Sequence, residues 1–170
     1  MSRRRALIAG ALLGAGLLSA AAISYGVSAA STRASSVTGA GNLQIKSMLD
    51  TSFCVDVDES GPQPAVILSQ CTAVASQRFT LSNGADGLNL FLDSRGRCLS
   101  QGPKLSAGFY AISVKPCTYR SRERWSFSPL GAFTVGVAQR CATVSRAAAN
   151  VAVNLVPCQG TNSQLWKLAQ

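Results

Sequence analysis

One short motif occurs three times in this chain and constrains its fold more than any other feature. A cysteine is followed six residues later by a long amide or acid, and two residues after that by an aromatic residue. The copies are Cys71 with Gln77-Arg78-Phe79, Cys117 with Glu123-Arg124-Trp125, and Cys158 with Gln164-Leu165-Trp166. Constant spacing of this kind indicates one structural unit repeated three times. The fold must therefore be built from three similar units.

The N-terminal stretch is predicted to lie outside these units. Residues 1–30 have three arginines at 3–5, an uncharged run from 6 to 24, and small residues at 27–30, which is typical of a signal peptide. A retained membrane anchor is the alternative, but the many Ala and Gly residues make the run weakly hydrophobic. A twin-arginine signal is a weaker match, because Ala6 stands where an aromatic residue is expected. Residues 31–41 are expected to be a flexible linker, and the mature chain to be secreted and free of the membrane.

The six cysteines are expected to form three disulfides in an exported chain. Six cysteines allow 15 pairings in principle. One bridge within each unit is the only pairing that treats the units alike: Cys54–Cys71, Cys98–Cys117 and Cys141–Cys158. A metal site is not predicted, because the chain has no His and its cysteines do not have zinc-ligand spacing.

Short β-branched segments separated by turn residues predict an all-β domain. The segments before the second cysteines, 65–70, 111–116 and 152–157, align without a gap. Further strands are expected where each unit begins, at 43–45, 88–92 and 132–137, and where it ends, at 78–81, 124–127 and 165–168. Propeller blades have a similar period, but three blades are too few. The units are therefore predicted to close into a barrel with threefold pseudo-symmetry.

The residues of the repeated motif are expected to lie in and beside the core of this barrel. One aromatic residue per unit is expected to be buried there: Phe79, Trp125 and Trp166. The amide or acid beside each aromatic is expected to bond to the backbone where strands diverge, because a polar group at the edge of a core needs partners. These residues are Gln77, Glu123 and Gln164.

The repeated cysteine and Q-x-W pattern resembles the ricin B-type lectin family over about residues 42–170. Gln164-Leu165-Trp166 matches the motif in full, and 54–57 resembles the Cys-Leu-Asp-Val segment that opens such repeats. The resemblance implies a β-trefoil, a carbohydrate-binding module of three pseudo-symmetric repeats with one disulfide per repeat. We call the lobes α (about 42–86), β (87–130) and γ (131–170). Each lobe would carry one sugar pocket.

The family's pocket residues are only partly kept, as the resemblance places them. An acid is expected two residues after the first cysteine, an aromatic two before the second, and an Asn ahead of the Gln. The α lobe supplies Asp56 and Gln77, with Ser69 and Ser76 at the other two positions. The other lobes read Ser100, Lys115, Arg122 and Glu123 in β, and Thr143, Val156, Ser163 and Gln164 in γ, with Asn162 one position early. Any sugar site is therefore predicted to be in α, weak, and centred on Asp56, for which a structural role in a turn is the alternative.

A stacking residue could come from elsewhere in the chain. Phe109 and Tyr110 lie in a loop of the β lobe that is two residues longer than its counterparts, and Tyr119 follows Cys117. An aromatic face is what the axial hydrogens of a sugar pack against. Of these residues, Tyr110 is expected to pack within the domain rather than to stack on a ligand.

Positive charge is concentrated in the middle of the chain. The formal net charge is +9, and residues 87–130 carry seven bases against two acids, whereas residues 42–86 carry two bases against five acids. Arg120, Arg122 and Arg124 alternate, so an extended segment would place them on one face. With Lys115 they form a candidate patch for an anionic ligand, such as a cell-envelope polymer. The alternative is a solvated face, and no motif for sequence-specific nucleic-acid recognition is present.

Catalysis is not expected, because a chain without His lacks the ordinary triads and its acids cluster in one loop. No cofactor is predicted. The first hypothesis is a secreted, non-catalytic carbohydrate-binding module that recognises a polysaccharide or glycoconjugate. The second is a degenerate trefoil that contacts a protein or anionic cell-envelope polymers through its basic β and γ lobes.

Overall fold

The computed structural model describes residues 41–83, 88–136 and 140–170. The predicted signal peptide and all but the last residue of the predicted linker lie outside these ranges. The strands are β1 (Gln44–Ser47), β2 (Phe53–Asp58), β3 (Ala65–Gln70), β4 (Thr80–Asn83), β5 (Asn89–Leu92), β6 (Cys98–Ser106), β7 (Phe109–Lys115), β8 (Trp125–Phe127), β9 (Phe133–Val135), β10 (Arg140–Thr143), β11 (Val151–Ala152), β12 (Asn154–Pro157) and β13 (Trp166–Ala169). Short 3-10 turns form η1 (Ala75–Gln77), η2 (Ser121–Glu123) and η3 (Asn162–Gln164). None of these helical turns has the length and apolarity needed to span a bilayer.

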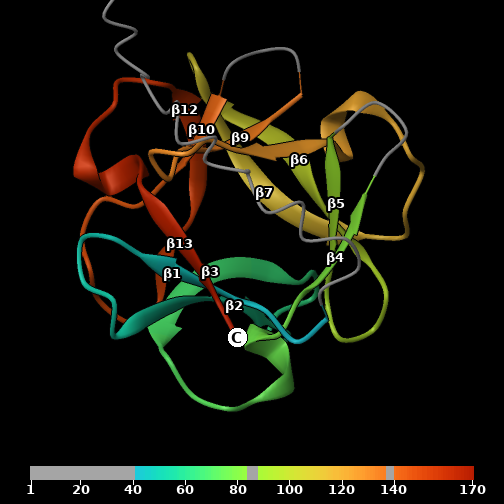
Figure 1. Ribbon diagram of the computed structural model, residues 1–170. Helices are drawn as coiled ribbons and strands as arrows, with labels where there is room; N and C mark the ends of the chain where they lie inside the picture. Colours follow the sequence, from blue (N-terminus) through green and yellow to red (C-terminus); the bar gives the residue numbers. More distant parts are fainter. Residues whose placement is uncertain (1–40, 84–87, 137–139) are drawn as a thin grey trace, which may run out of the picture. The chain divides into compact units, whose positions relative to one another are not determined.

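Each lobe repeats the same order of elements. The α lobe runs from β1 to β4, the β lobe from β5 to β8, and the γ lobe from β9 to β13 (Figure 1). In every lobe a 3-10 turn precedes the last strand, and in γ the third strand is divided at Val153 into β11 and β12. The predicted all-β class and threefold repetition are confirmed.

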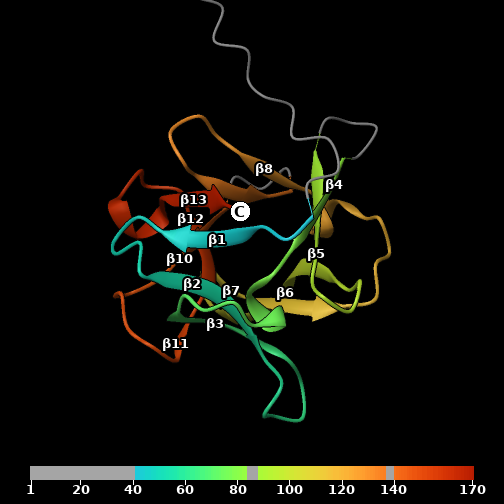
Figure 2. The same ribbon diagram turned by 60° about the horizontal axis from the view of Figure 1, so that its bottom comes forward.

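The first and last strands of the lobes close a barrel. β1 pairs with β13 from Gln44↔Ala169 to Ser47↔Trp166, and Figures 1 and 2 show these two strands side by side. β4 likewise pairs with β5, and β8 with β9. The ring is completed within each lobe by Leu43↔Phe79, Asn89↔Trp125 and Ala132↔Leu165. A closed barrel leaves no free edge among these strands.

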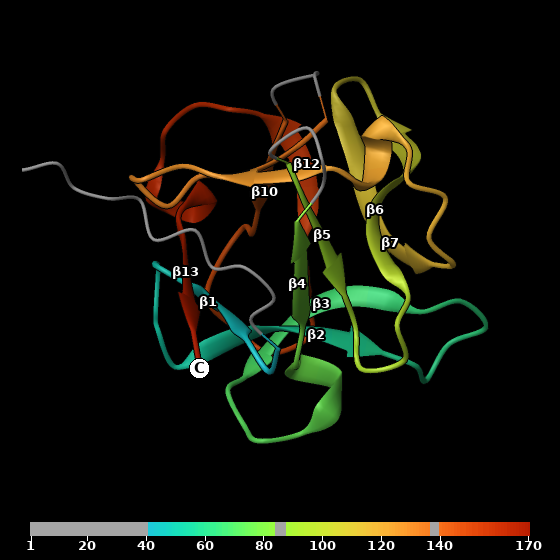
Figure 3. The same ribbon diagram turned by 45° about the vertical axis from the view of Figure 1, so that its right-hand side comes forward.

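The middle strands of the lobes form three hairpins that cover one end of the barrel. The hairpins are β2–β3, β6–β7 and β10–β12. They also pair with one another, through Ala65↔Ser113, Asn154↔Ala111 and Val151↔Leu68. Figure 3 shows the β6–β7 hairpin extending beside the barrel strands β4 and β5. Three hairpins that pair in a ring on a six-stranded barrel, within the described ranges, are the architecture of a β-trefoil.

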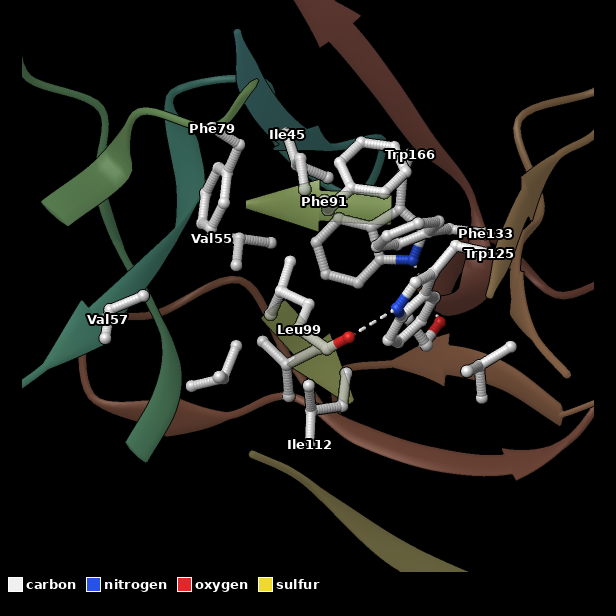
Figure 4. Close-up of a cluster of buried hydrophobic side chains, with 14 of the residues drawn as sticks. Ile45, Val55, Val57, Phe79, Phe91, Leu99, Ile112, Trp125, Phe133 and Trp166 are labelled. Carbon is white, nitrogen blue, oxygen red and sulfur yellow. Dashed lines mark hydrogen bonds between the residues drawn. The ribbon is translucent and has the colours of Figure 1, made fainter. Parts of the chain in front are cut away.

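The three aromatic residues of the repeated motif lie in the core, as expected. Phe79, Trp125 and Trp166 are 1%, 0% and 1% exposed. Figure 4 shows Trp125 and Trp166 converging with Phe91 and Phe133, and the Trp125 and Phe133 rings stack with centroids 4.3 Å apart. The Nε1–H of Trp125 donates to the Leu99 carbonyl at 2.9 Å, and that of Trp166 donates to Ala142 at 2.9 Å. Buried indoles are therefore satisfied by the first strand of their own hairpin.

One disulfide in each lobe joins the first hairpin strand to a cysteine that lies just after the second hairpin strand. The bonds are Cys54–Cys71, Cys98–Cys117 and Cys141–Cys158, with Cα atoms 4.9, 5.0 and 5.0 Å apart. The predicted pairing is confirmed. A bridge that closes a loop of this size stabilises a fold by about 3 kcal/mol, mainly by restricting the unfolded chain.

One local prediction is wrong. Arg120, Arg122 and Arg124 do not lie on an extended segment, because Ser121–Glu123 forms the 3-10 turn η2. The backbone N–H of Glu123 donates to Arg120, and that of Arg124 donates to Ser121. A turn separates the alternating side chains, so the three arginines do not form a stripe on one face.

Candidate functional site

The strand register places the same positions together in all three lobes. The position of the family's acid lies directly opposite a residue of the next strand: Asp56↔Ile67, Ser100↔Ser113 and Thr143↔Asn154. The position of the family's aromatic lies opposite the first cysteine: Cys54↔Ser69, Cys98↔Lys115 and Cys141↔Val156. Opposed residues of an antiparallel pair share a face, and so do residues two apart on a strand. Each hairpin therefore presents one equivalent face, which we call the pocket face.

The amide of the repeated motif holds the α pocket face in place. Gln77 is 1% exposed, and its Oε1 accepts from the Thr72 backbone N–H at 2.7 Å. Its Nε2 donates to the Gln70 carbonyl at 2.8 Å and to Oδ2 of Asp56 at 2.9 Å. The second of these bonds fixes the acid on the pocket face. We call this set of bonds the clamp.

The γ lobe has the same clamp with a different partner. Oε1 of Gln164 accepts from the backbone N–H groups of Gln159 and Gly160, at 2.7 and 3.1 Å. Its Nε2 donates to the Pro157 carbonyl at 3.0 Å and to Oγ1 of Thr143 at 3.1 Å. A hydroxyl therefore occupies the place of the α-lobe carboxylate.

In the β lobe the clamp is formed by a carboxylate, that of Glu123, which can only accept hydrogen bonds. Glu123 is 1% exposed and accepts from the Thr118 N–H at 2.8 Å, the Tyr119 N–H at 2.7 Å and the Thr118 hydroxyl at 2.8 Å. Burial raises the pKa of Glu123, but hydrogen bonds from Thr118 and from the backbone of Tyr119 and Arg120 outweigh it, so the pKa is lowered. Ser100, at the position of the acid, is buried and carries no charge to oppose it. All three clamps bond to the backbone, as the sequence predicted.

The remaining α-lobe site residues lie around Asp56. Its carboxylate is half-buried, and among the described residues no hydrogen bond reaches Oδ1. Ser69 and Ser76 are half-buried. The neighbouring acids are engaged elsewhere: Oδ1 of Asp58 accepts from the Ser60 N–H at 2.9 Å, which lowers the pKa of Asp58.

Glu59 links two lobes instead of lying free in an acidic loop. It forms ion pairs with Arg95, at 3.2 Å, and with Arg97, both on the turn between β5 and β6. Arg97 also pairs at 2.6 Å with the buried Asp93. Hydrogen bonds to Glu59 and Asp93 raise the pKa of the Arg97 guanidinium. No local sequence pattern predicts this contact, since the partners are more than thirty residues apart.

A hollow of about 490 Å³ lies over the γ pocket face. It is lined by the three family positions Thr143, Val156 and Ser163, by Asn154, and by Phe109 from the β lobe. Phe109 is 46% exposed. Sequence reasoning missed Asn154, although its place opposite Thr143 in the hairpin follows from the cysteine-based alignment.

The hairpin tip that carries Phe109 is anchored to the γ lobe. Nη1 of Arg140 donates to the Gly108 carbonyl at 2.8 Å, and the guanidinium lies 4.5 Å from the centre of the Tyr110 ring. Tyr110 also packs against the hydrophobic core, as expected. Tyr119 is 67% exposed and lines none of the hollows described here.

Two hollows flank the β pocket face. One, of about 530 Å³, is lined by Lys115, Arg120, Arg122 and Glu123, together with Thr118 and Ser121. The other, of about 420 Å³, shares Lys115 and Arg122 and extends to Gln101 and Ser113. Arg124 lines neither hollow and is half-buried after the turn. Three of the four residues of the predicted anionic patch thus lie together, and Arg124 lies apart from them.

Three lobes with one register, one disulfide and one clamp each define a β-trefoil of repeated pocket faces. Residues 88–170 match the profile of the ricin-type beta-trefoil lectin domain. The predicted resemblance to the ricin-type lectin family is therefore confirmed over the β and γ lobes. The α lobe has the same order of strands, the same register and the same clamp.

Solved structures share the fold at low sequence identity. The designed threefold-symmetric protein ThreeFoil aligns with a TM-score of 0.65 and 14% identity over 75% of this chain and 97% of its own. A mosquitocidal holotoxin aligns with a TM-score of 0.66 and 13% identity over 78% of this chain, which spans only 17% of the toxin chain. A non-toxic homologue of type II RIPs from Momordica charantia, in complex with α-methyl-D-galactoside, aligns with a TM-score of 0.61 and 19% identity over 78% of this chain and 48% of that one. A search of curated protein sequences found no match.

Proposed function

We propose that the trefoil is a carbohydrate-binding module with its principal sugar site on the α pocket face. The observation that carries the proposal is the bond between Gln77 and Asp56, which holds a carboxylate on the face where a ricin-type domain would bind its sugar. The Momordica charantia relative was solved with a galactoside, which supports a sugar as the ligand. A binding module of this kind would have no catalytic role.

The geometry around Asp56 fits a weak site. Oδ2 is occupied by Gln77, and Oδ1 is free to accept from a sugar hydroxyl. Ser69 and Ser76 add hydroxyl groups that can donate and accept. No aromatic residue stands at position 69, so the apolar face of a sugar gains little stacking energy. We expect affinity in the millimolar range, about −4 kcal/mol.

Removing the Asp56 carboxylate tests this assignment. Neutral glycans would be titrated against the full chain, Asp56→Ala and the control Asp58→Ala, which removes the same charge from the same strand without touching the clamp. Asp56→Ala should weaken binding about tenfold, because a hydrogen bond to a charged group contributes about 1.5–3 kcal/mol. Asp58→Ala should bind as the parent does. Equal binding by all three proteins would contradict an α-lobe site.

The γ hollow is the second place where a neutral sugar would bind. Phe109 lines this hollow together with Thr143 and Asn154. An aromatic ring can stack on a sugar, and hydroxyl and amide groups can bond to its hydroxyls. Phe109→Ala should therefore weaken any binding that survives Asp56→Ala. Unchanged binding by Phe109→Ala would restrict the sugar to the α lobe.

Export completes the proposal. The three disulfides suit an oxidising compartment, and the leader has the composition of a signal peptide. Mass spectrometry of protein recovered from the medium should give an N-terminus close to residue 31. Recovery of the uncleaved chain in membranes would instead support an anchor.

A further inference from the structure

The pocket face of the β lobe carries positive charge at positions that are neutral in the other two lobes. At three equivalent positions the α lobe has Ser69, Val74 and Ser76, and the γ lobe has Val156, Thr161 and Ser163, all neutral. The β lobe has Lys115, Arg120 and Arg122 at these positions. Ser100 also replaces the acid that Asp56 supplies in α. Relative to the α lobe, all four differences make the β pocket face more positive.

The three cations surround hollows rather than a flat surface. Lys115 and Arg122 line both the 530 Å³ and the 420 Å³ hollow, and Arg120 lines the larger. All three side chains belong to exposed residues, and none forms a salt bridge with an acid of the described ranges. Unpaired cations that converge on a concavity are free to bind an anion.

The single acid of the site does not cancel this charge. Glu123 also lines the larger hollow, but its carboxylate is occupied by three donors from Thr118 and Tyr119. Its oxygens therefore already have their hydrogen-bond partners, and three cations against one carboxylate leave a net positive site.

We propose that the β pocket face binds the oxyanion group of a charged saccharide, a sulfate or phosphate ester. Arg120 and Arg122 would donate to the ester oxygens, since guanidinium groups form paired, charge-assisted hydrogen bonds with such groups. Lys115 would add a point charge from the end of β7. The hydroxyl and amide groups of Ser113, Thr118, Ser121 and Gln101 line the same hollows and would bond to sugar hydroxyls. The sugar part of this proposal rests on the proposed function, whereas the anion part does not.

The arrangement favours a localised ester over a long polyanion. A protein that follows a nucleic-acid backbone needs cations spread along its path. Here the expected arginine stripe is broken by η2, and Arg124 lies outside both hollows. The charge is therefore concentrated on one pocket face, next to groups that suit a sugar.

Dextran and its charged derivatives provide the test, because they share one backbone. The full chain would be passed over surfaces bearing neutral dextran, carboxymethyl dextran, dextran sulfate and dextran phosphate. We expect retention on dextran sulfate or dextran phosphate at least about tenfold above that on neutral dextran, with the stronger of the two naming the ester. Equal retention on carboxymethyl dextran would contradict an ester site, and no retention on any charged surface would overturn the proposal.

A matched pair of double variants separates a site from general surface charge. Lys115→Ala with Arg122→Ala removes two charges from the hollows, and Lys104→Ala with Arg146→Ala removes two exposed charges outside them. The first pair should lose about tenfold or more in binding to the preferred ester, and the control pair less than about threefold. Equal losses of binding by the two double variants would show attraction by general surface charge and would contradict a localised site. Urea midpoints measured alongside should be unchanged, because all four residues are exposed.

Two further measurements keep this proposal distinct from the proposed function. Asp56→Ala should keep its binding to the charged dextran, since the two pocket faces use different residues. Inorganic sulfate and phosphate would be tested as competitors. Displacement by the free ion at concentrations equal to the polymer-linked ester would show that the anion alone is bound, which would contradict the saccharide part. Failure of neutral-glycan binding with retention on the charged dextran would contradict only the α-lobe site.

Discussion

A carboxylate at the clamp position should be compatible with a stable fold only where the acid position opposite it carries no second carboxylate. The β lobe provides the natural case, with Glu123 as its clamp and an uncharged Ser100 at the acid position. Gln77 instead faces Asp56. Gln164 faces the hydroxyl of Thr143. Gln77→Glu and Gln164→Glu are therefore one chemical change made against two different partners.

The structure gives the expected magnitude. Gln77→Glu removes donated bonds of 2.9 Å to Asp56 and 2.8 Å to the Gln70 carbonyl, each contributing about 1 kcal/mol. Two carboxylates about 4 Å apart repel by about 4 kcal/mol at an effective dielectric constant of about 20. Protonation of one carboxylate limits the total, so we expect a loss of about 3–5 kcal/mol in the free energy of unfolding at neutral pH. Gln164→Glu should lose about 1–2 kcal/mol, because the Thr143 hydroxyl, which now donates to the Cys141 carbonyl at 3.0 Å, can rotate and donate to the new carboxylate instead.

Urea unfolding with the disulfides intact, at neutral pH and at about pH 4, measures both losses. Repulsion raises the pKa of the introduced carboxyl, so the repulsive part of the loss grows as the pH rises through that pKa. It is absent below the ordinary value of about 4.3, where only the loss of the hydrogen bonds remains. Adding Asp56→Ser to Gln77→Glu reproduces the β-lobe pair and should recover most of the stability. Equal losses for the two single variants at neutral pH, or a Gln77→Glu loss that does not change with pH, would refute the reasoning.

Three further predictions concern stability. Arg97→Ala should cost about 3 kcal/mol in the free energy of unfolding, because it removes the ion-pair partner of the buried Asp93, whose Oδ1 keeps only the backbone N–H groups of residues 95 and 97. The control Arg95→Ala, with a side chain 64% exposed, should cost less than about 1 kcal/mol in urea unfolding. Gly131→Ala should lower the thermal midpoint clearly, because Gly131 has φ +91° and a Cβ there would lie 2.8 Å from a backbone oxygen. Since the folded pKa of Glu123 is lowered from 4.5, its stabilising effect is present above that value and is lost as the pH falls through the folded pKa; Glu123→Gln should flatten this part of a stability profile.

Much of the fold could be predicted because it repeats. Three copies of one motif identify the disulfide partners, the buried aromatics and the clamps at once, and the structure agrees at each of these positions. One such cysteine or tryptophan alone, without the repeat, would not have identified a disulfide partner or a core position. Repetition works as an internal control, since a feature that recurs at one spacing must serve the scaffold that the units share.

Features that occur once were harder to predict. The alternation of Arg120, Arg122 and Arg124 looked like strand chemistry, but Glu123 needs the backbone of the preceding turn for its hydrogen bonds, and η2 forms instead. The link from Glu59 to the β5–β6 turn depends on how lobes meet. The hollow beside Phe109 depends on a hairpin tip held by a residue of the next lobe. Contacts of this kind leave no local pattern in the sequence.

The clamps also determine how an extended ligand would meet the protein. Each clamp bonds within its own lobe, so the pocket faces can differ in chemistry on one and the same barrel. One face now holds a carboxylate, one is cationic and one is uncharged. The backbones of the three lobes are therefore related by threefold pseudo-symmetry, whereas the three pocket faces are not equivalent. A polymer that touches two lobes would encounter unlike chemistry in a fixed order, and so would lie on the protein in only one direction.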